Sequence, residues 1–80
     1  MTHDYIFEKV AEIIAKNVGQ SKLDLNRNTL SSDVEGWGSL QHIMIISEIE
    51  ENFGIKFDFM EIMEMNSIGD ICNAIEKQNP

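Results

Sequence analysis

The chain has 80 residues, of which 42% are apolar, so it is long enough for one domain over residues 1–80 and too apolar for a disordered acidic tail. Fourteen acidic residues against six basic ones give a formal net charge of −8. This charge disfavours nucleic acid and anionic membranes as partners, because both bind clustered lysine and arginine, and it favours proteins with basic patches. A domain this small has no room for both a core and a walled substrate cleft, which favours a binding or carrier module over an enzyme.

The sequence also bears on location and metal content. No apolar run is long enough to span a membrane, and charges interrupt the apolar residues of the first ten positions, unlike a signal peptide. The single cysteine, Cys72, cannot form an internal disulfide, and the two histidines, His3 and His42, are too distant to complete a zinc site. We therefore expect a cytoplasmic, monomeric protein without a metal site.

The first predicted helix runs from about Asp4 to Val18. Its apolar residues recur at helical spacing and define one buried stripe: Ile6, Val10, Ile13, Ile14 and Val18. Gly19 follows as the helix end, because glycine adopts the left-handed conformation at low cost.

Between Gln20 and Gly38 the helical periodicity disappears. The segment is rich in polar residues and glycine, yet it contains apolar residues at intervals: Leu23, Leu25, Leu30, Val34 and Trp37. Loops this long are uncommon in small domains unless they have a role. We expect an ordered loop that crosses the helices, with Trp37 as an anchor.

The second predicted helix runs from Ser39 to about Phe53, with Gly54 at its end. Its expected inward stripe follows spacings of three and four residues: Leu40, Ile43, Ile46, Ile49 and Phe53. Three acids, Glu48, Glu50 and Glu51, lie in its C-terminal half, where they oppose the helix dipole. Their unfavourable placement hints at a role outside the fold.

Ile55 to Phe57 is expected to be an extended connector, followed by a short helix from about Phe59 to Glu64. Ser67 and Asp70 form a capping box that opens the last helix, Ile68 to Lys77. That helix is expected to bury Ile68, Ile71, Cys72 and Ile75. We expect core packing for most of the methionines Met60, Met63 and Met65, although such residues could also line a space for an apolar ligand.

Ser39 stands where the loop becomes an apolar-striped helix, directly after Gly36-Trp37-Gly38. A serine hydroxyl at a helix N-terminus is exposed, and the unpaired backbone N–H groups there favour a phosphate. The position therefore suits the attachment of a phosphodiester. On the local pattern alone, however, a simple N-cap role for Ser39 explains the serine better.

The run Gly38-Ser39-Leu40, the acidic amphipathic helix that ends in Glu50-Glu51-Asn52-Phe53-Gly54-Ile55, and the segment Asn66 to Ile71 together resemble acyl carrier proteins and peptidyl carrier domains. The likeness covers nearly the whole chain. It implies an all-α four-helix bundle with a long loop between the first two helices and a short third helix. It also implies that Ser39 carries 4′-phosphopantetheine, whose thiol holds an acyl or aminoacyl group as a thioester, and that Leu40 is the motif leucine.

One position departs from the family pattern. Gly38 stands where the family usually has an aspartate, which is implicated in recognition and metal binding by the transferase that attaches the arm. Glycine is an acceptable N-cap, so the fold should tolerate the change. An alternative function is therefore a carrier-like interaction module whose serine is not modified.

The resemblance also implies a docking surface for a phosphopantetheinyl transferase and for acyl-transferring or synthase enzymes with basic patches, in a fatty-acid-like or specialised pathway. Its candidate residues are Leu40, Met44, Glu48, Glu50, Glu51, Glu61 and Glu64. Met44 occupies a position where fatty-acid carriers often have an acid, and it either contacts a partner or broadens the core stripe.

His42 lies three residues after Ser39 on the same side of the predicted helix. A Ser and His pair raises a third hypothesis, a small hydrolase, but no third catalytic group or oxyanion site is evident. We expect a surface histidine, no catalytic residue and no enzymatic activity, and we interpret Cys72 as a small core residue.

Overall fold

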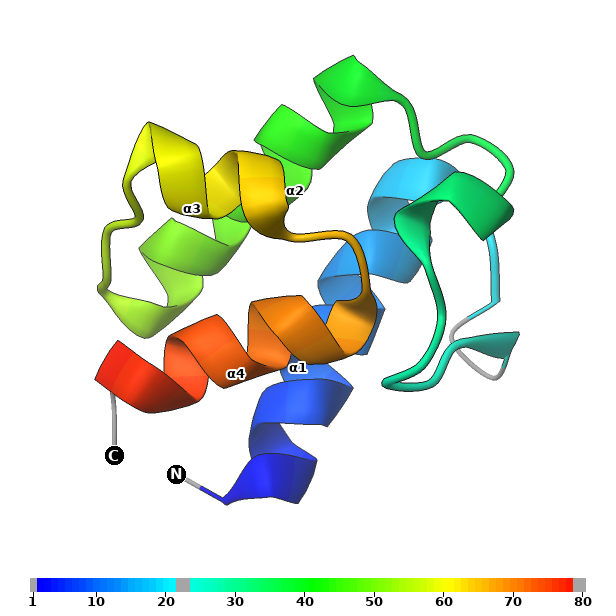
Figure 1. Cartoon of the computed structure of the whole chain (residues 1–80). Helices are drawn as coiled ribbons and strands as arrows, with labels where there is room; N and C mark the ends of the chain where they lie inside the picture. Colours follow the sequence, from blue (N-terminus) through cyan, green and yellow to red (C-terminus); the bar gives the residue numbers. More distant parts are fainter. Residues whose placement is uncertain (1, 22–23, 79–80) are drawn as a thin grey trace.

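Four α-helices and one 3-10 turn make up the computed structural model, which describes residues 2–21 and 24–78 (Figure 1). The elements are α1 (His3–Val18), η2 (Ser31–Asp33), α2 (Ser39–Phe53), α3 (Phe59–Glu64) and α4 (Ile68–Gln78). No strand occurs in the described ranges, and the predicted all-α class with a long first loop and a short third helix is confirmed. Leu23 lies outside the described residues.

α1 begins one residue earlier than predicted. The Oγ1 atom of Thr2 accepts a hydrogen bond from the backbone N–H of Tyr5 at 3.1 Å, which caps the helix at this earlier point. Gly19 ends the helix at φ +72°, as predicted. The five predicted stripe residues are all buried, so the apolar face of α1 is confirmed.

α2 has the predicted bounds, but the predicted stripe is partly wrong. Ile46 and Ile49 are buried as expected, together with Ile45, whereas Leu40 and Ile43 are 67% and 49% exposed. Each step of three residues falls about 60° short of a full turn, so successive steps rotate away from the buried face. Leu40 therefore lies about 120° around the helix from Ile46.

In the described part of the long loop between α1 and α2, two apolar side chains, Leu25 and Trp37, are buried in the core. Leu30 is 43% exposed, so it does not serve as an anchor. The expected crossing loop, with Trp37 as an anchor, is confirmed.

Backbone hydrogen bonds fasten this loop to the segment that leads into α4. The N–H of Ser31 donates to the carbonyl of Asn66 at 2.9 Å, and the N–H of Ile68 donates to the carbonyl of Thr29 at 3.0 Å. These bonds pair backbone groups that would otherwise be buried without a hydrogen-bond partner. They hold the loop in place although no β-sheet is involved.

α3 has the predicted bounds, but most of its apolar side chains face outward. Phe59 and Met60 are each 68% exposed and Met63 is 60% exposed, whereas Ile62 is half-buried. The expectation of core packing holds for Met65, which is buried, and is wrong for Met60 and Met63. A helix of six residues has only one narrow face toward the bundle, so it cannot bury four large side chains.

α4 opens with the predicted capping box. The N–H of Asp70 donates to Ser67 Oγ at 3.0 Å, and the N–H of Ser67 donates to Asp70 Oδ2 at 3.1 Å. The four residues expected to be buried, including Cys72, are fully buried. The helix extends one residue beyond the prediction, and its last residue, Gln78, donates from Nε2 to the carbonyl of Lys56 at 2.8 Å.

The core lies where α1 packs against both α2 and α4. In Figure 1 α1 (blue) passes behind α4 (orange), α2 (green) lies above them, and α3 (yellow) crosses in front of α2. Among the described helices, none is both long enough and apolar enough to cross a bilayer.

Candidate functional site at the start of α2

Ser39 is the first residue of α2, and its side chain is exposed. The N-cap is Gly38, with extended backbone angles of φ −97° and ψ −172°, so Ser39 does not cap the helix as the local pattern favoured. Gln41 takes over part of the capping role, because its Oε1 atom accepts a hydrogen bond from the N–H of Gly38 at 3.2 Å. Within the described residues no hydrogen bond engages the Ser39 hydroxyl, which is therefore available for modification.

The backbone at the start of α2 favours an anion. The N–H of His42 is the first to close a helical turn, donating to the carbonyl of Gly38 at 2.9 Å. The N–H groups of Ser39, Leu40 and Gln41 precede it and have no helical acceptor, and the helix dipole is positive at this end. A phosphate on Ser39 would lie beside these donors, which suits phosphodiester attachment.

A groove of about 390 Å³ opens beside Ser39 between α2, α3 and the loop. It is lined by Ser31, Trp37, Gly38, Ser39, His42, Ile43, Ile62, Met63, Met65 and Asn66. None of these side chains carries a carboxylate, a lysine ammonium or a guanidinium. The groove therefore offers an apolar floor with a few polar groups next to the serine.

His42 is partly buried in this groove, so the expectation of a surface histidine is wrong. Its Nδ1 atom accepts a hydrogen bond from Trp37 Nε1 at 3.1 Å, and its Nε2 atom lies 3.1 Å from the carbonyl oxygen of Ile62. Both ring nitrogens are occupied, so neither can take a proton from Ser39 as a hydrolase would require. This geometry argues against the pairing of Ser39 with His42 in catalysis.

Glu48 and Glu50, two of the predicted docking acids, bind groups within the fold. Glu48 pairs with Lys16 and accepts a hydrogen bond from Asn17 Nδ2 at 3.2 Å. The hydrogen bond from Lys16, helped by that from Asn17, lowers the pKa of the Glu48 carboxyl below its ordinary value despite partial desolvation. Glu50 accepts from the N–H of Phe57 at 2.8 Å and thereby holds the connector after α2.

The remaining candidate acids lie at the surface. Glu51, Glu61 and Glu64 are exposed. Glu61 accepts a hydrogen bond from the N–H of Asp58 at 3.3 Å, which caps α3. Among the described residues, no three His, Cys, Asp or Glu side chains gather closely enough to hold a metal ion.

Sequence reasoning missed most of the exposed apolar surface of α2 and α3. Six large apolar side chains of α2 and α3 are about half exposed or more, and we call them the apolar face: Leu40, Ile43, Met44, Phe59, Met60 and Met63. Met44 is 50% exposed, so it does not belong to the core. The one signal in the sequence was the shortness of α3, which cannot bury so many large residues.

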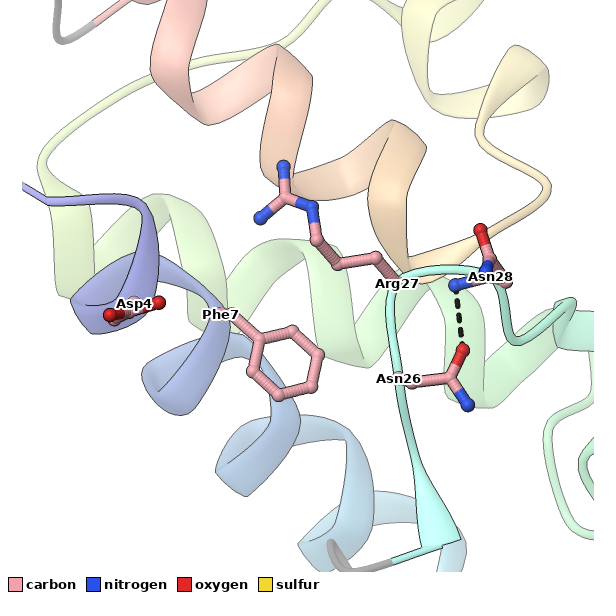
Figure 2. A pocket seen from close by; sticks show the side chains of 5 residues that line it. All are labelled: Asp4, Phe7, Asn26, Arg27 and Asn28. Carbon is pink, nitrogen blue, oxygen red and sulfur yellow. Dashed lines mark hydrogen bonds between the residues drawn. The ribbon is translucent and has the colours of Figure 1, made fainter.

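A second hollow, of about 560 Å³, lies between the start of α1 and the loop (Figure 2). It is lined by Asp4, Phe7, Asn26, Arg27 and Asn28, and it shares no residue with the groove beside Ser39. The Arg27 guanidinium, drawn in Figure 2, pairs with Glu76 at 3.2 Å and also donates to Asn73. Because this cation is already neutralised, the hollow is a weaker candidate than the groove.

Comparison with known proteins identifies the family. The model of the family described as "Phosphopantetheine attachment site" matches residues 8–75, which is most of the chain. The chain belongs to this family of acyl carrier proteins. This match confirms the resemblance to acyl carrier proteins that the sequence indicated.

Curated acyl carrier proteins match along almost their full length. The acyl carrier protein of Thermotoga maritima is 29% identical over 77 residues, covering 96% of this chain and 95% of the relative. That of Streptococcus pyogenes is 32% identical over 74 residues, covering 92% and 96%. The solution structure of a holo acyl carrier protein from Geobacter metallireducens superimposes with a TM-score of 0.80 at 25% identity, over 91% of this chain and 84% of that one.

The covalent cofactor of this acyl carrier protein is 4′-phosphopantetheine, as predicted, and the groove region fits such a group. Three features match its chemistry: the free hydroxyl of Ser39, the unpaired N–H groups at the start of α2, and the apolar lining beside them. Gly38 has the extended backbone of an N-cap residue, and it lacks the side-chain carboxylate that the family pattern places at this end of α2.

Proposed function

We propose that Ser39 is the residue that carries the phosphopantetheine arm and that the chain transports an acyl or aminoacyl group between enzymes without catalysing a reaction itself. The observation that carries the proposal is the position of Ser39 as an exposed first residue of α2 beside the groove. Other serines fit less well. Ser47 is exposed in the middle of α2, and the hydroxyl of Ser67 is used to cap α4.

The arm supplies a flexible tether that ends in a thiol, on which cargo is held as a thioester. Residues of the chain bind and orient this tether. The N–H groups of Leu40 and Gln41 would hold the phosphate oxygens, because they lack helical acceptors. Ile43 and Met63 line the groove and would receive the apolar part of the arm or of its cargo.

The apolar face supports docking of protein partners around Ser39. Neither α2 nor α3 contains a lysine or an arginine, while Glu51, Glu61 and Glu64 are exposed on them. A partner with an apolar centre and a basic rim would therefore be complementary, since opposite charges steer encounter and apolar contacts hold the complex. We expect a phosphopantetheinyl transferase and acyl-transferring or synthase enzymes to use this surface.

Contacts within the fold make two of the candidate glutamates less important for docking than the others. Glu48 and Glu50 already accept hydrogen bonds from within the fold, so they contribute less to a partner than Glu51 and Glu61. Leu40 and Met44 gain importance because both are exposed. An exposed methionine adapts to irregular apolar surfaces, which favours a carrier dedicated to a specialised pathway over a general fatty-acid carrier.

Gly38 supports a second candidate function, that of a carrier-like interaction module whose Ser39 stays unmodified. A β-carbon at position 38 would meet Gln41 Oε1 at 3.1 Å, so an aspartate needs only a small shift of that flexible side chain. Gly38→Asp should therefore keep the fold, with stability changed by a few tenths of a kcal/mol. This variant isolates the effect of the missing carboxylate on loading.

The test is the intact mass after incubation with coenzyme A and a broad-specificity phosphopantetheinyl transferase. The serine oxygen displaces adenosine 3′,5′-bisphosphate from coenzyme A, so one phosphopantetheine is gained per chain. We compare the wild type with Ser39→Ala and Gly38→Asp. Ser47→Ala is the matched control, because Ser47 is an exposed serine of the same helix.

A gain that is absent only in Ser39→Ala supports the carrier function and shows that the missing aspartate is dispensable. A mass gain in Gly38→Asp but not in the wild type favours one of two conclusions. Either the wild type is an interaction module that is not modified, or its loading needs a dedicated transferase. If neither chain gains mass, the carrier proposal fails for this class of transferase. Loading of Ser39→Ala would move the attachment point to another residue.

A further inference from the structure

His42 makes two directional hydrogen bonds that determine its protonation pattern. Trp37 Nε1–H can only donate, and the carbonyl oxygen of Ile62 can only accept. Since Trp37 donates to His42 Nδ1 at 3.1 Å, that nitrogen carries no proton, and Nε2 must donate to Ile62 at 3.1 Å. In this arrangement Nδ1 of His42 is the acceptor and Nε2 is the donor.

The two bonds join three segments that are separate in sequence. Trp37 is only 9% exposed and precedes Ser39 by two residues, at the end of the long loop. The Trp37 and His42 rings are close to coplanar, with centroids 6.0 Å apart and planes 29° apart, as an in-plane hydrogen bond requires. Ile62 belongs to α3, and its carbonyl also receives the N–H of Met65 at 3.3 Å at the end of that helix.

His42 itself lies one helical turn after Ser39 in α2. It therefore connects the turn that leads into Ser39 with the short helix that carries half of the apolar face. α3 has few other anchors, because Ile62 is the single half-buried side chain among its six residues. Without the imidazole, the start of α2 loses its direct hydrogen bond to α3, although the Ser31–Asn66 bond still joins the loop to the segment after α3.

We propose that His42 is a positioning residue of the carrier site, which holds Trp37 and α3 at a set distance and thereby orients Ser39 and the groove for the arm. This rests on the proposed attachment at Ser39, but the bonds are testable without it. The connection also couples α3 to the turn before Ser39. If a partner that binds α3 shifts Ile62, the shift is transmitted to Trp37 through the side chain of His42.

The first experiment examines the connection itself in a His3→Gln background, which leaves His42 as the only histidine. Long-range proton–nitrogen NMR should show Nε2 as the donor nitrogen of the ring and Nδ1 as the acceptor. Exchange of the Trp37 indole proton should be slow in this protein and about fivefold faster or more in His42→Leu, which keeps an apolar volume but removes both bonds. The amide signals of Gly38 and Ser39 should shift in His42→Leu.

The second experiment measures kcat/KM of phosphopantetheine transfer from coenzyme A. His42→Leu should lower it roughly five- to thirtyfold, the loss expected for one to two net hydrogen bonds. His42→Gln should recover most of the rate, because an amide can both accept from Trp37 and donate to Ile62. Trp37→Phe should lower the rate similarly, and the double variant with His42→Leu should lose no more than either single variant.

Gly19→Ala serves as a control for general destabilisation, because Gly19 lies outside the groove. Unchanged indole exchange and unchanged Ser39 signals in His42→Leu would overturn the proposal, as would transfer at the wild-type rate. A wild-type chain that is never loaded, but whose Ser39 signals depend on His42, would instead overturn the attachment proposal and leave the positioning role supported.

Discussion

Gly36 faces the carbonyl of Val18 at the end of α1 so closely that a β-carbon at position 36 would lie 2.7 Å from its oxygen. Gly36 also has φ +90°, a region that side chains disfavour. The turn before Ser39 is thus packed directly against α1, three residues from the attachment site. Its position depends on a glycine that no other residue can replace without movement of the backbone.

Gly36→Ala should therefore lower the free energy of unfolding by ~2 kcal/mol or more, from strain plus the contact with Val18. Gly19→Ala is the matched control, because Gly19 has φ +72° but nothing within 4 Å of an added β-carbon. It should cost only ~1 kcal/mol. Urea denaturation followed by circular dichroism measures both, and equal losses would show that the contact with Val18 is unimportant.

Ile46 and Ile43 offer a test of the corrected face of α2. Ile46 is 1% exposed and Ile43 is 49% exposed, although both follow the same spacing in the sequence. Ile46→Ala should cost about 2–5 kcal/mol, because it leaves a cavity in the core. Ile43→Ala should cost under about 1 kcal/mol, since little burial is lost. Similar losses in urea denaturation would mean that Ile43 is buried.

Glu48→Gln should remove the ion pair with Lys16 and keep an acceptor for Asn17. The Lys16 side chain is 66% exposed, so solvent weakens this ion pair. The free energy of unfolding should therefore fall by only ~0.5 kcal/mol, and by less in high salt. Urea denaturation in low and high salt measures this difference. A loss that is unchanged by salt would indicate that packing, not charge, is responsible.

The same pair predicts a pH dependence. The folded-state pKa of Glu48 is lowered, so the stabilisation is present above its ordinary value of 4.5 and is lost as the pH falls through the folded-state value. The difference in stability between the wild type and Glu48→Gln should therefore be constant near neutral pH and disappear in acid. A difference that grows in acid would contradict the assignment.

Cys72 should be unreactive in the folded protein. Burial raises the pKa of its thiol from 9.0 to about 11, so the reactive thiolate is about a hundredfold rarer than in the unfolded chain at the same pH. Modification by a disulfide reagent at pH 8 should be slow in buffer and fast in urea. Fast modification of the folded chain would contradict the buried position.

The raised pKa of Cys72 also affects stability in alkali. The unfolded chain loses the thiol proton first, so stability should fall as the pH rises from 9.0 toward about 11. Cys72→Ala lacks this group, and its stability should decrease less over the same range. Parallel curves for the two proteins would exclude the thiol as the cause.

Much of the fold was predictable because its signals are local. Gly19 and Gly54 ended their helices where predicted, and the Ser67 and Asp70 capping box opened α4, because each involves residues within one turn of one another. The position of Ser39 at the start of α2 followed from the same kind of local change, from an aperiodic loop to a periodic helix.

The surface of the candidate site was not predictable to the same degree. Leu40 and Ile43 follow helical spacing as well as Ile46 does, and the packing of α2 against the rest of the core, α1 above all, decides which of them is buried. Glu48 and Glu50 look alike in the sequence, yet one binds α1 and the other the connector after α2. Such partners are set by segments that meet in space.

The sequence by itself determined the helices to within one residue at each end, the serine at the start of α2 and the family, because periodicity, capping and motif spacing are all short-range properties. Only the tertiary structure decided that His42 joins Trp37 to Ile62, that Gly36 contacts Val18 and that six large apolar side chains of α2 and α3 are exposed. Those relationships depend on how the loop, α1 and α3 pack together, and no local pattern of residues encodes a contact between elements far apart in the chain.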